Sequence, residues 1–252
     1  MRFRNQTVVV TGAGGGIGQA ICRAFHSEGA RVGIADLPGS AGEAFARSLG
    51  DRALFVALDV TQEADWVDAL DAVEAAFGSI DVVVNNAGYF QPNIAFEEMP
   101  LDVWQRHYAV NVDGTFLGCK HGIRRMMARR RGAIVNIGSG MSIKANPMAS
   151  AYCGAKAAVL MTTRTAAASA GAYNIRVNAV LPGAVDTAML MGNLVEGEVP
   201  AAYLDRMAKH SVLGRLATPE DIAHGVLMLA DPASSAITGV FLPVDGGNLP
   251  GA

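Results

Sequence analysis

Tyr152 and Lys156 lie four residues apart in "SAYCGAKAAV" (150–159), a run of small residues that favours a helix. Positions i and i+4 share one face of a helix, so the phenol and the ammonium can reach the same point in space. A cation beside a phenol favours the phenolate and lowers the pKa of the tyrosine. Such a pair could exchange a proton near neutral pH. A packed tyrosine and a lysine that reaches solvent would show the same spacing, so the pair alone does not establish a site.

A glycine-rich segment, "VVVTGAGGGIGQA" (8–20), follows an apolar run typical of a strand and opens a helical pattern. The strict G-x-G-x-x-G spacing is absent, and the pattern present is T-G-x-x-x-G-x-G through Thr11, Gly12, Gly16 and Gly18. Glycines let the backbone approach a phosphate, and a helix N-terminus offers free N–H groups. A tight strand-to-helix turn would explain the glycines alone. Their place after the first strand favours a dinucleotide site.

An acidic residue, Asp36, ends the second apolar run, 18 residues after Gly18. A carboxylate there can accept hydrogen bonds from the adenosine ribose hydroxyls. It would repel the extra phosphate of NADP by roughly 1–4 kcal/mol at ~4 Å. Neither Gly15 nor Leu37 supplies a compensating cation. The sequence therefore predicts NAD as the cofactor.

Short β-branched runs alternate with longer helical patterns along the chain. The expected strands are 7–10, 31–35, 53–58, 81–85, 133–137, 175–180 and 240–244. The expected helices are 17–28, 40–49, 62–77, 101–129, 151–171 and 219–230. This alternation predicts an α/β fold, a doubly wound (Rossmann-type) parallel seven-stranded sheet with helices on both faces. We expect a single dinucleotide-binding and catalytic domain over 1–252. Residues 184–217 form a long excursion, the kind of insertion that often builds a substrate pocket.

The composition narrows the class of protein. The chain has 252 residues, of which 51% are hydrophobic and 17% charged, and its formal net charge is −3. This balance argues against nucleic acid and anionic membranes as partners. Three cysteines without C-x-x-C spacing suit a reducing compartment, and no leader-like segment opens the chain, so we expect a cytoplasmic protein. The five histidines form no metal-binding pattern, so no metal site is expected.

Taken together, these features make the chain resemble the short-chain dehydrogenase/reductase family over residues 5–247. Further matches follow in family order: Asp59 and Val60, "NNAG" at 85–88, "AVNVDGTF" around Asn111, "NIGSG" around Ser139, and "LPGAVDT" at 181–187. The chain departs from the family at Asn5 and Gln6, where Gly-Lys usually precedes the first strand. That departure touches no chemistry.

The resemblance implies hydride transfer between NAD(H) and a secondary alcohol or ketone. Tyr152 would be the general acid/base, Ser139 would hydrogen-bond the substrate oxygen, and Lys156 would bind the nicotinamide ribose. Asn111 would hold a water that links Lys156 to solvent. A tyrosine with an ordinary pKa of ~10 needs ~4 kcal/mol of stabilisation of its phenolate to work near pH 7.

The resemblance also implies a cofactor-binding set, and loop residues around the substrate. The expected cofactor residues are Gly12, Gly14, Gly16, Ile17, Gly18, Asp36, Asp59, Val60, Asn86, Gly88, Tyr152, Lys156, Pro182, Gly183, Val185 and Thr187. The expected substrate residues are Ser139, Met141, Tyr152 and Met189. Other apolar side chains on the same loops are Tyr89, Phe90, Met148, Leu190 and Met191. Because these side chains are apolar, they favour a cyclic or aliphatic alcohol over a sugar as the substrate.

Three alternatives stay open. One is a 3-oxoacyl-thioester reductase, which would be expected to use NADP, and another is a sugar dehydrogenase. The third is an NAD-sensing binding protein, which would need the glycine loop and Asp36 but not Ser139, Asn111, Tyr152 and Lys156 together. The C-terminal strand region and the helices at 101–129 and 151–171 match the family's assembly surfaces, so we expect a homotetramer.

Overall fold

The computed structural model describes residues 1–194 and 197–248. Residues 195–196, within the predicted excursion, and the last four residues of the predicted domain lie outside the described part. The described chain contains one seven-stranded sheet in the order β3-β2-β1-β4-β5-β6-β7, and each neighbouring pair of strands is parallel. The strands are β1 (Thr7–Thr11), β2 (Arg31–Asp36), β3 (Ala53–Ala57), β4 (Val82–Asn85), β5 (Gly132–Ile137), β6 (Ile175–Pro182) and β7 (Phe241–Val244).

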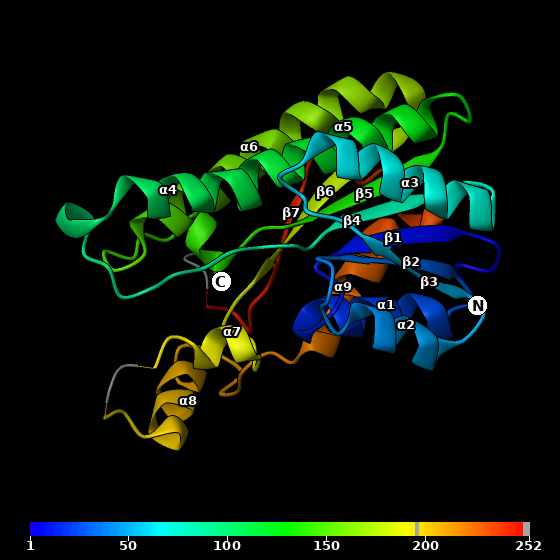
Figure 1. Ribbon diagram of the computed structural model, residues 1–252. Coiled ribbons are helices and arrows are strands. Elements are labelled where there is room, and N and C mark those ends of the chain that lie inside the picture. The colour runs from blue at the N-terminus through cyan, green and yellow to red at the C-terminus, as the bar shows by residue number, and fades with distance from the viewer. Residues whose placement is uncertain (195–196, 249–252) are drawn as a thin grey trace.

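Helices cover both faces of the sheet (Figure 1). One layer holds α1 (Gly16–Ser27), α2 (Gly42–Leu49) and α9 (Pro219–Ala230). The other holds α3 (Glu63–Phe77), α5 (Gly114–Met127) and α6 (Ser150–Ala170). Along β1, Val8 and Val10 pack against the first layer, whereas Val9 packs against the second. Side chains on a strand alternate between faces, so an unbroken apolar run fills two cores at once.

The predicted α/β fold is confirmed, and each predicted strand differs from the observed one by at most two residues at an end. Strand order reverses between β1, which extends to β2 and β3, and β4, which begins the other half. Crevices form at such a reversal, beyond the carboxyl ends of the strands. The fold therefore offers a ligand site above β1, β4 and β5.

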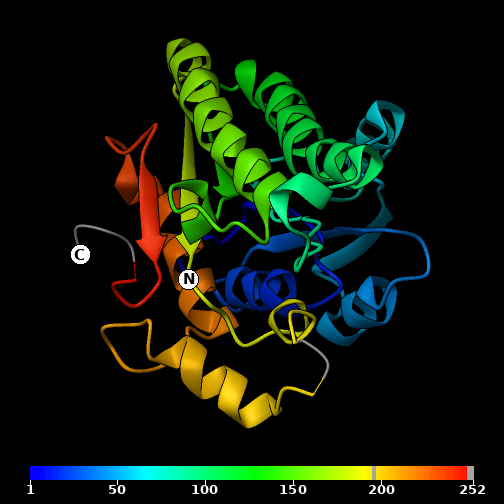
Figure 2. The same cartoon turned by 90° about the vertical axis from the view of Figure 1, so that its left-hand side faces the viewer.

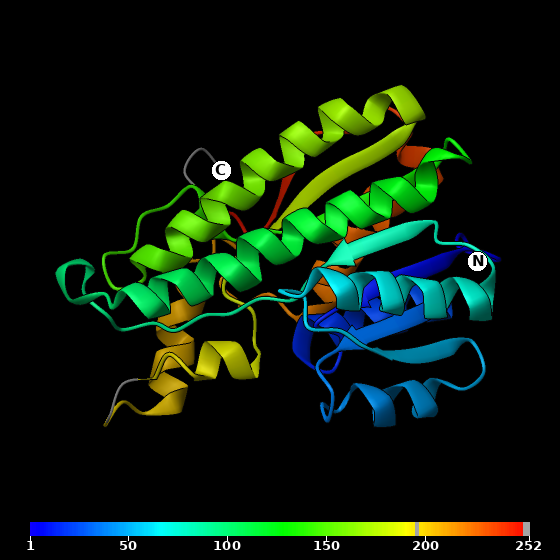
Figure 3. The same ribbon diagram turned by 45° about the horizontal axis from the view of Figure 1, so that its top comes forward.

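The helix predicted at 101–129 is divided. It consists of α4 (Leu101–Tyr108), a π-helical turn (Ala109–Asp113) and α5. Figure 3 shows α4 and α5 following one another along α6. A π turn accommodates one extra residue, which breaks the 3.6-residue rhythm without ending the helix. Asn111 lies inside this turn and is fully buried.

The excursion after β6 carries two short helices, α7 (Ala188–Met191) and α8 (Pro200–Ala208). Thr187 caps α7 by accepting a hydrogen bond from Leu190 N, and Pro200 occupies the first turn of α8. Figure 1 shows these helices beyond the carboxyl edge of the sheet, and Figure 2 views the molecule from that side. Short helical turns complete the structure at Phe96–Glu98, Gly140–Ser142, Gly171–Tyr173 and Pro232–Ser234.

In the part of the chain that the structure describes, no helix has both the length and the apolar character needed to cross a bilayer. Over the same residues, no group of three or more His, Cys, Asp or Glu side chains is arranged to hold a metal ion.

Candidate active site

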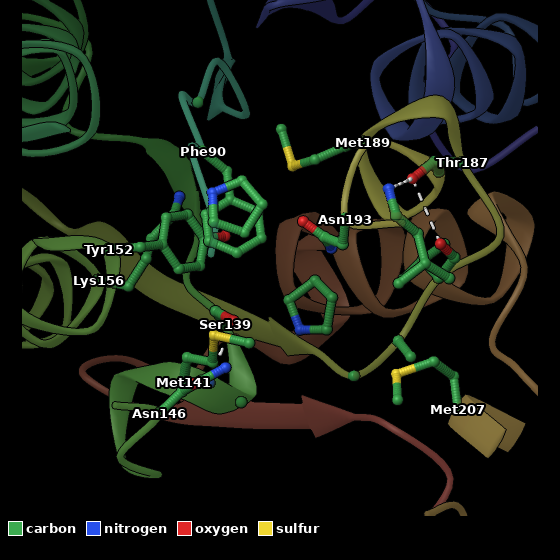
Figure 4. A pocket seen from close by; sticks show the side chains of 18 of the residues that line it. Phe90, Ser139, Met141, Asn146, Tyr152, Lys156, Thr187, Met189, Asn193 and Met207 are labelled. Carbon is green, nitrogen blue, oxygen red and sulfur yellow. Dashed lines mark hydrogen bonds between the residues drawn. The ribbon is translucent and has the colours of Figure 1, made fainter. Parts of the chain in front are cut away.

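A cavity of about 950 Å³ opens at the carboxyl edge of the sheet, between the β4 and β5 loops and the α7–α8 excursion. Its wall contains 15 of the predicted site residues, from segments far apart in the chain. They are Gly12, Gly16, Ile17, Gly18, Asn86, Gly88, Ser139, Met141, Tyr152, Lys156, Pro182, Gly183, Val185, Thr187 and Met189. Figure 4 shows Tyr152, Ser139, Met141 and Met189 around this space.

Tyr152 and Lys156 lie on one face of α6, as their spacing predicts. The Lys156 Nζ atom lies 5.7 Å from the centre of the Tyr152 ring and donates a hydrogen bond to Ile137 O at 2.8 Å. The Lys156 side chain is 3% exposed, whereas Tyr152 is partly exposed. An ammonium carries three donors, so this one retains two for other partners in the cavity.

The pKa of Tyr152 differs from the expectation that Lys156 lowers it. Burial raises the pKa of the Tyr152 hydroxyl to about 12, although a hydrogen bond with Ser139 opposes the rise. Burial also lowers the pKa of the Lys156 ammonium to about 8. The lowering of the Tyr152 pKa that was expected from Lys156 is therefore absent in the protein chain by itself. The apolar surroundings disfavour both charged groups more than their attraction across 5.7 Å favours them.

Ser139 begins the short helical turn after β5. Its Oγ accepts a hydrogen bond from Met141 N at 3.1 Å, and Ser142 Oγ accepts one from Ser139 N at 3.1 Å. This reciprocal capping fixes the rotamer of Ser139. Since its Oγ accepts from the backbone, its proton can point to Tyr152 or to a substrate oxygen.

Asn111 does not line the cavity. Its Nδ2 donates to Tyr89 O and His107 O, both at 2.9 Å, and its Oδ1 accepts from Tyr89 N at 3.2 Å. Both amide protons are thus used within the protein. Any link from Asn111 to a water would have to use the remaining acceptor capacity of Oδ1 or of the backbone carbonyl.

Gly12 and Gly18 in the glycine loop are packed too closely to carry a side chain. A Cβ at Gly12 would lie 2.8 Å from Ala87 Cα, and Gly12 has a φ of +60°. A Cβ at Gly18 would lie 2.3 Å from Gly12 O. Asn86 Nδ2 holds the loop by donating to Thr11 O at 2.9 Å and to Gly12 O at 3.0 Å. The loop thus brings bare backbone to the rim of the cavity.

The N-terminus of α1 points into the same region and has no side-chain cap and no acid in its first turn. Its free N–H groups and positive dipole end suit a phosphate. The residues present therefore fit a dinucleotide.

Asp36 lies outside the cavity wall, at the carboxyl end of β2. Its Oδ2 accepts from Gly14 N at 2.6 Å, and its Oδ1 accepts from Leu37 N at 2.7 Å. The carboxylate thus stands directly against the glycine loop. Gly14 also lies outside the wall, and its missing side chain leaves room for the carboxylate, because a Cβ there would lie 2.7 Å from Asp36 Oδ2.

Asp59 and Val60 follow β3 and likewise lie outside the cavity wall. Asp59 Oδ1 accepts from Thr61 N and Thr61 Oγ1, and Val60 O accepts from Trp66 Nε1 at 3.0 Å. With Asp36, they mark a second region at the carboxyl ends of β2 and β3. A dinucleotide that spans the glycine loop would have one half in the cavity and the other here.

Several cavity residues were not predicted from the sequence. They include Asn146, Asn193, Tyr203, Arg206, Met207, His210 and Asn248. Most lie on the excursion or on the loop before α6, where no motif or periodicity marks them. Of the apolar loop residues, Phe90, Met148 and Leu190 line the cavity, whereas Tyr89 and Met191 do not.

Comparison with known proteins identifies the family. The family model described as Enoyl-(Acyl carrier protein) reductase matches residues 12–248. The chain is 40% identical to cis-4-hydroxycyclohexanecarboxylate dehydrogenase of Sinomonas cyclohexanicum, over 97% of each chain. It is 39% identical to 2-(S)-hydroxypropyl-CoM dehydrogenase 3 of Xanthobacter autotrophicus, over 98% of this chain and 97% of that one. It is 38% identical to 2,5-dichloro-2,5-cyclohexadiene-1,4-diol dehydrogenase of Sphingobium indicum, over 96% of each.

These relatives are dehydrogenases named for hydroxyl-bearing substrates, and they match this chain over nearly its whole length. The structure brings the sequence motifs together. The glycine loop and the side chains of Ser139, Tyr152 and Lys156 line one cavity at the edge of the parallel sheet. The chain belongs to the short-chain dehydrogenase/reductase family.

Proposed function

We propose that this protein oxidises a cyclic secondary alcohol to its ketone, or catalyses the reverse reduction, with NAD(H) as cofactor and Tyr152 as general acid/base. The family makes the chain an alcohol oxidoreductase that works with a nicotinamide cofactor. The observation that carries the proposal is the placement of Ser139, Tyr152 and Lys156 together in the wall of one cavity, beside the glycine loop.

In the oxidation direction, Tyr152 Oη takes the hydroxyl proton of the alcohol. In the reduction direction the same oxygen returns a proton to the ketone oxygen. Ser139 Oγ donates a hydrogen bond to the substrate oxygen, and its rotamer is already fixed by the hydrogen bond from Met141 N. Ser139 lies close enough to Tyr152 to affect the pKa of its hydroxyl, so both groups can meet the same substrate atom.

Lys156 stands behind this pair. Its Nζ is anchored to Ile137 O, 5.7 Å from the Tyr152 ring, and retains two donors for the nicotinamide ribose. A nicotinamide cofactor held here would supply the hydride chemistry, and its oxidised ring would add positive charge to the cavity. Because burial alone raises the pKa of Tyr152 to about 12, proton removal from this phenol depends on positive charge in the cavity.

The cofactor would span both regions of the site. Gly12, Gly16 and Gly18 with the α1 N-terminus would hold its phosphates, while Pro182 to Thr187 would border the nicotinamide half. Asp36 would accept from the adenosine ribose hydroxyls, and Asp59 and Val60 would border the adenine. The Asp36 carboxylate beside the glycine loop supports NAD over NADP, since a 2′-phosphate there would meet a like charge.

The substrate end of the cavity supports a cyclic alcohol. Phe90, Met141, Met148, Met189 and Met207 give it largely apolar walls. Methionine side chains adapt to irregular apolar shapes, which suits a ring better than a densely hydroxylated sugar. Two of the relatives described above are named for six-membered carbocyclic alcohols.

We also propose a cytoplasmic homotetramer. Cys22, Cys119 and Cys153 are all free thiols, as suits a reducing compartment. Two separate regions expose large apolar side chains: Phe116 and Met161 on α5 and α6, and Met228 and Val240 on and after α9. Two distinct self-complementary contacts are what a tetramer of twofold symmetry requires.

A substrate screen tests the proposed function. The purified protein is assayed by NADH or NADPH absorbance with a cyclohexanol, a cyclohexane diol, 4-hydroxycyclohexanecarboxylate, a straight-chain secondary alcohol, a sugar and a 3-hydroxyacyl thioester. We expect the highest kcat/KM with a cyclic alcohol and NAD. Preference for the thioester and NADP would identify the reductase alternative. NAD binding without turnover on any compound would identify a sensor and contradict the proposal.

A further inference from the structure

His107, on α4, is fully buried although no catalytic or binding role has been assigned to it above. Both of its ring nitrogens have partners. Nδ1 lies 2.8 Å from Val103 O, and Nε2 lies 3.2 Å from Gln91 N. Val103 lies one turn earlier on the same helix, whereas Gln91 belongs to the loop after β4. This arrangement links α4 to the loop after β4.

The partners fix the protonation of the ring. A backbone carbonyl only accepts, so Nδ1 must carry the proton, and a backbone N–H only donates, so Nε2 must carry the lone pair. His107 is therefore a neutral imidazole in one tautomer. Burial and the neighbouring Arg106 charge lower the pKa of His107, although the bond to Val103 O opposes them, which keeps the ring neutral near neutral pH.

The same loop is held a second time by Asn111, one turn further along. Asn111 bonds both the N–H and the C=O of Tyr89 through its side-chain amide. It also donates to His107 O, so the two residues form one connected group. The backbone is therefore held at residue 89 by Asn111 and at residue 91 by His107.

Phe90 lies between these two anchors. The Tyr89 ring packs edge-to-face on His107, with ring centres 4.8 Å apart. The Phe90 ring instead packs on Tyr152, with ring centres 4.4 Å apart and planes inclined by 40°. Figure 4 shows Phe90 and Tyr152 side by side at one end of the cavity. Phe90 also lines the cavity itself, so its position affects both the phenol and the substrate.

We propose that His107 is a positioning residue, which holds residue 91 through its Nε2 and thereby keeps Phe90 packed against Tyr152. The proposal rests on the proposed function, in which Tyr152 exchanges the proton. His107 touches neither the substrate nor the reacting atoms. The His107 ring also contacts the Tyr152 ring edge-on, with ring centres 6.3 Å apart. Any substitution of the imidazole removes that contact, whereas only one that removes the acceptor releases residue 91.

Two matched substitutions separate this role from simple space filling. His107→Asn can retain the donor to Val103 O but leaves Gln91 N–H without its acceptor. His107→Gln reaches further and can place an oxygen where Nε2 accepts. We expect H107N to lower kcat/KM about tenfold, as loss of the acceptor for a partly buried N–H would. We expect H107Q to stay within about threefold of the wild type.

A double-mutant cycle with Phe90→Leu tests the route of the effect. If His107 acts through Phe90, H107N should change kcat/KM by less than about twofold once the Phe90 ring is gone. A tenfold loss in both backgrounds would overturn the proposal. So would equal activities of H107N, H107Q and the wild type.

A readout without turnover keeps this inference separate from the proposed function. In protein labelled with ¹³C-tyrosine, the Tyr152 ring resonance is assigned by its loss in Tyr152→Phe. The ring current of Phe90 should displace this resonance in the wild type and in H107Q but not in H107N. An unchanged resonance in H107N would refute the positioning role. A wild type without turnover would refute only the proposed function.

Discussion

Lys156 is an ammonium group that the fold buries almost completely and that donates a hydrogen bond to Ile137 O. Burial lowers its pKa from 10.5 to about 8, so the folded protein releases this proton before the unfolded chain does. Between these pH values the unfolded state binds more protons, and the contribution of Lys156 to the free energy of unfolding rises with pH. Integrated over this range, the contribution is about 3 kcal/mol.

Lys156→Met should therefore increase the free energy of unfolding more near neutral pH than at high pH. The difference in unfolding free energy between K156M and the wild type should shrink by about 3 kcal/mol as pH rises from 8 to 10.5. Urea unfolding of both proteins across this range measures it. Other groups that titrate there, such as Cys119, cancel in the difference. A difference that stays constant with pH would contradict the burial of a charge at this position.

At the residue scale, the sequence predicted which side chains gather at the cavity better than it predicted their energetics. The spacing of Tyr152 and Lys156 predicts that they share one helix face, and Ser139 follows the end of a predicted strand. The direction of the Tyr152 pKa shift was not predictable, because the degree of burial depends on Phe90 and other distant segments. His107 was missed for the same reason: its partner Gln91 lies in a loop without regular periodicity.

Among the elements, the turn between β1 and α1 places tight steric limits on substitution. A Cβ at Gly18 would lie 2.3 Å from Gly12 O, whereas a Cβ at Gly15 would meet nothing within 4 Å. We expect Gly18→Ala to destabilise the fold by about 1–3 kcal/mol and to weaken NADH binding. Gly15→Ala serves as the matched control and should keep the wild-type unfolding temperature. Thermal unfolding and NADH titration check both, and equal stabilities would contradict the close packing of this loop.

We propose that the end of β2 determines the choice between NAD and NADP. Replacing Asp36 by Ala and Leu37 by Arg removes the carboxylate beside Gly14 and adds a cation for a 2′-phosphate. The ratio of kcat/KM for NADP to that for NAD should rise about tenfold or more, as removal of a like-charge contact predicts. Parallel assays with both cofactors measure the ratio. A ratio equal to that of the wild type would remove Asp36 from the ribose site.

Element by element, regular patterns were predictable and interruptions were not. The strands are apolar on both faces, so their runs stand out against the helical segments. The π turn at Ala109–Asp113 leaves almost no trace in a hydrophobic pattern, because one added residue only rotates the following helix. Helices α7 and α8 lie in the excursion after β6. Thr187 caps α7, but the sequence indicated only a cofactor-binding role for this residue.

The cavity is a property of the whole molecule. Its walls come from the β1, β4, β5 and β6 ends and from the excursion, so its shape follows from the strand order and not from any one segment. For this reason the sequence predicted the chemistry of the site but not most of the residues that line the substrate end. Asn193, Met207 and His210 enter the wall only because α7 and α8 lie over the carboxyl edge.

Assembly is the prediction that belongs to this scale. Exposed Phe116 and Met161 on one side, and Met228 and Val240 on another, should be covered by neighbouring subunits. Multi-angle light scattering should give four times the mass of one chain. Charged substitutions in one of the two regions, such as Phe116→Glu with Met161→Glu, should yield dimers. A monomeric wild type would contradict the proposed tetramer.

The central claim, that Tyr152 carries the proton while the rest of the cavity holds the cofactor, is tested most directly by Tyr152→Phe. The substitution removes one oxygen and keeps the ring against Phe90. We predict that kcat with the best cyclic alcohol falls by about a hundredfold to ten-thousandfold, the usual contribution of a general acid/base, while the Kd for NADH stays within about twofold. Retention of wild-type kcat in the Tyr152→Phe protein would contradict the account.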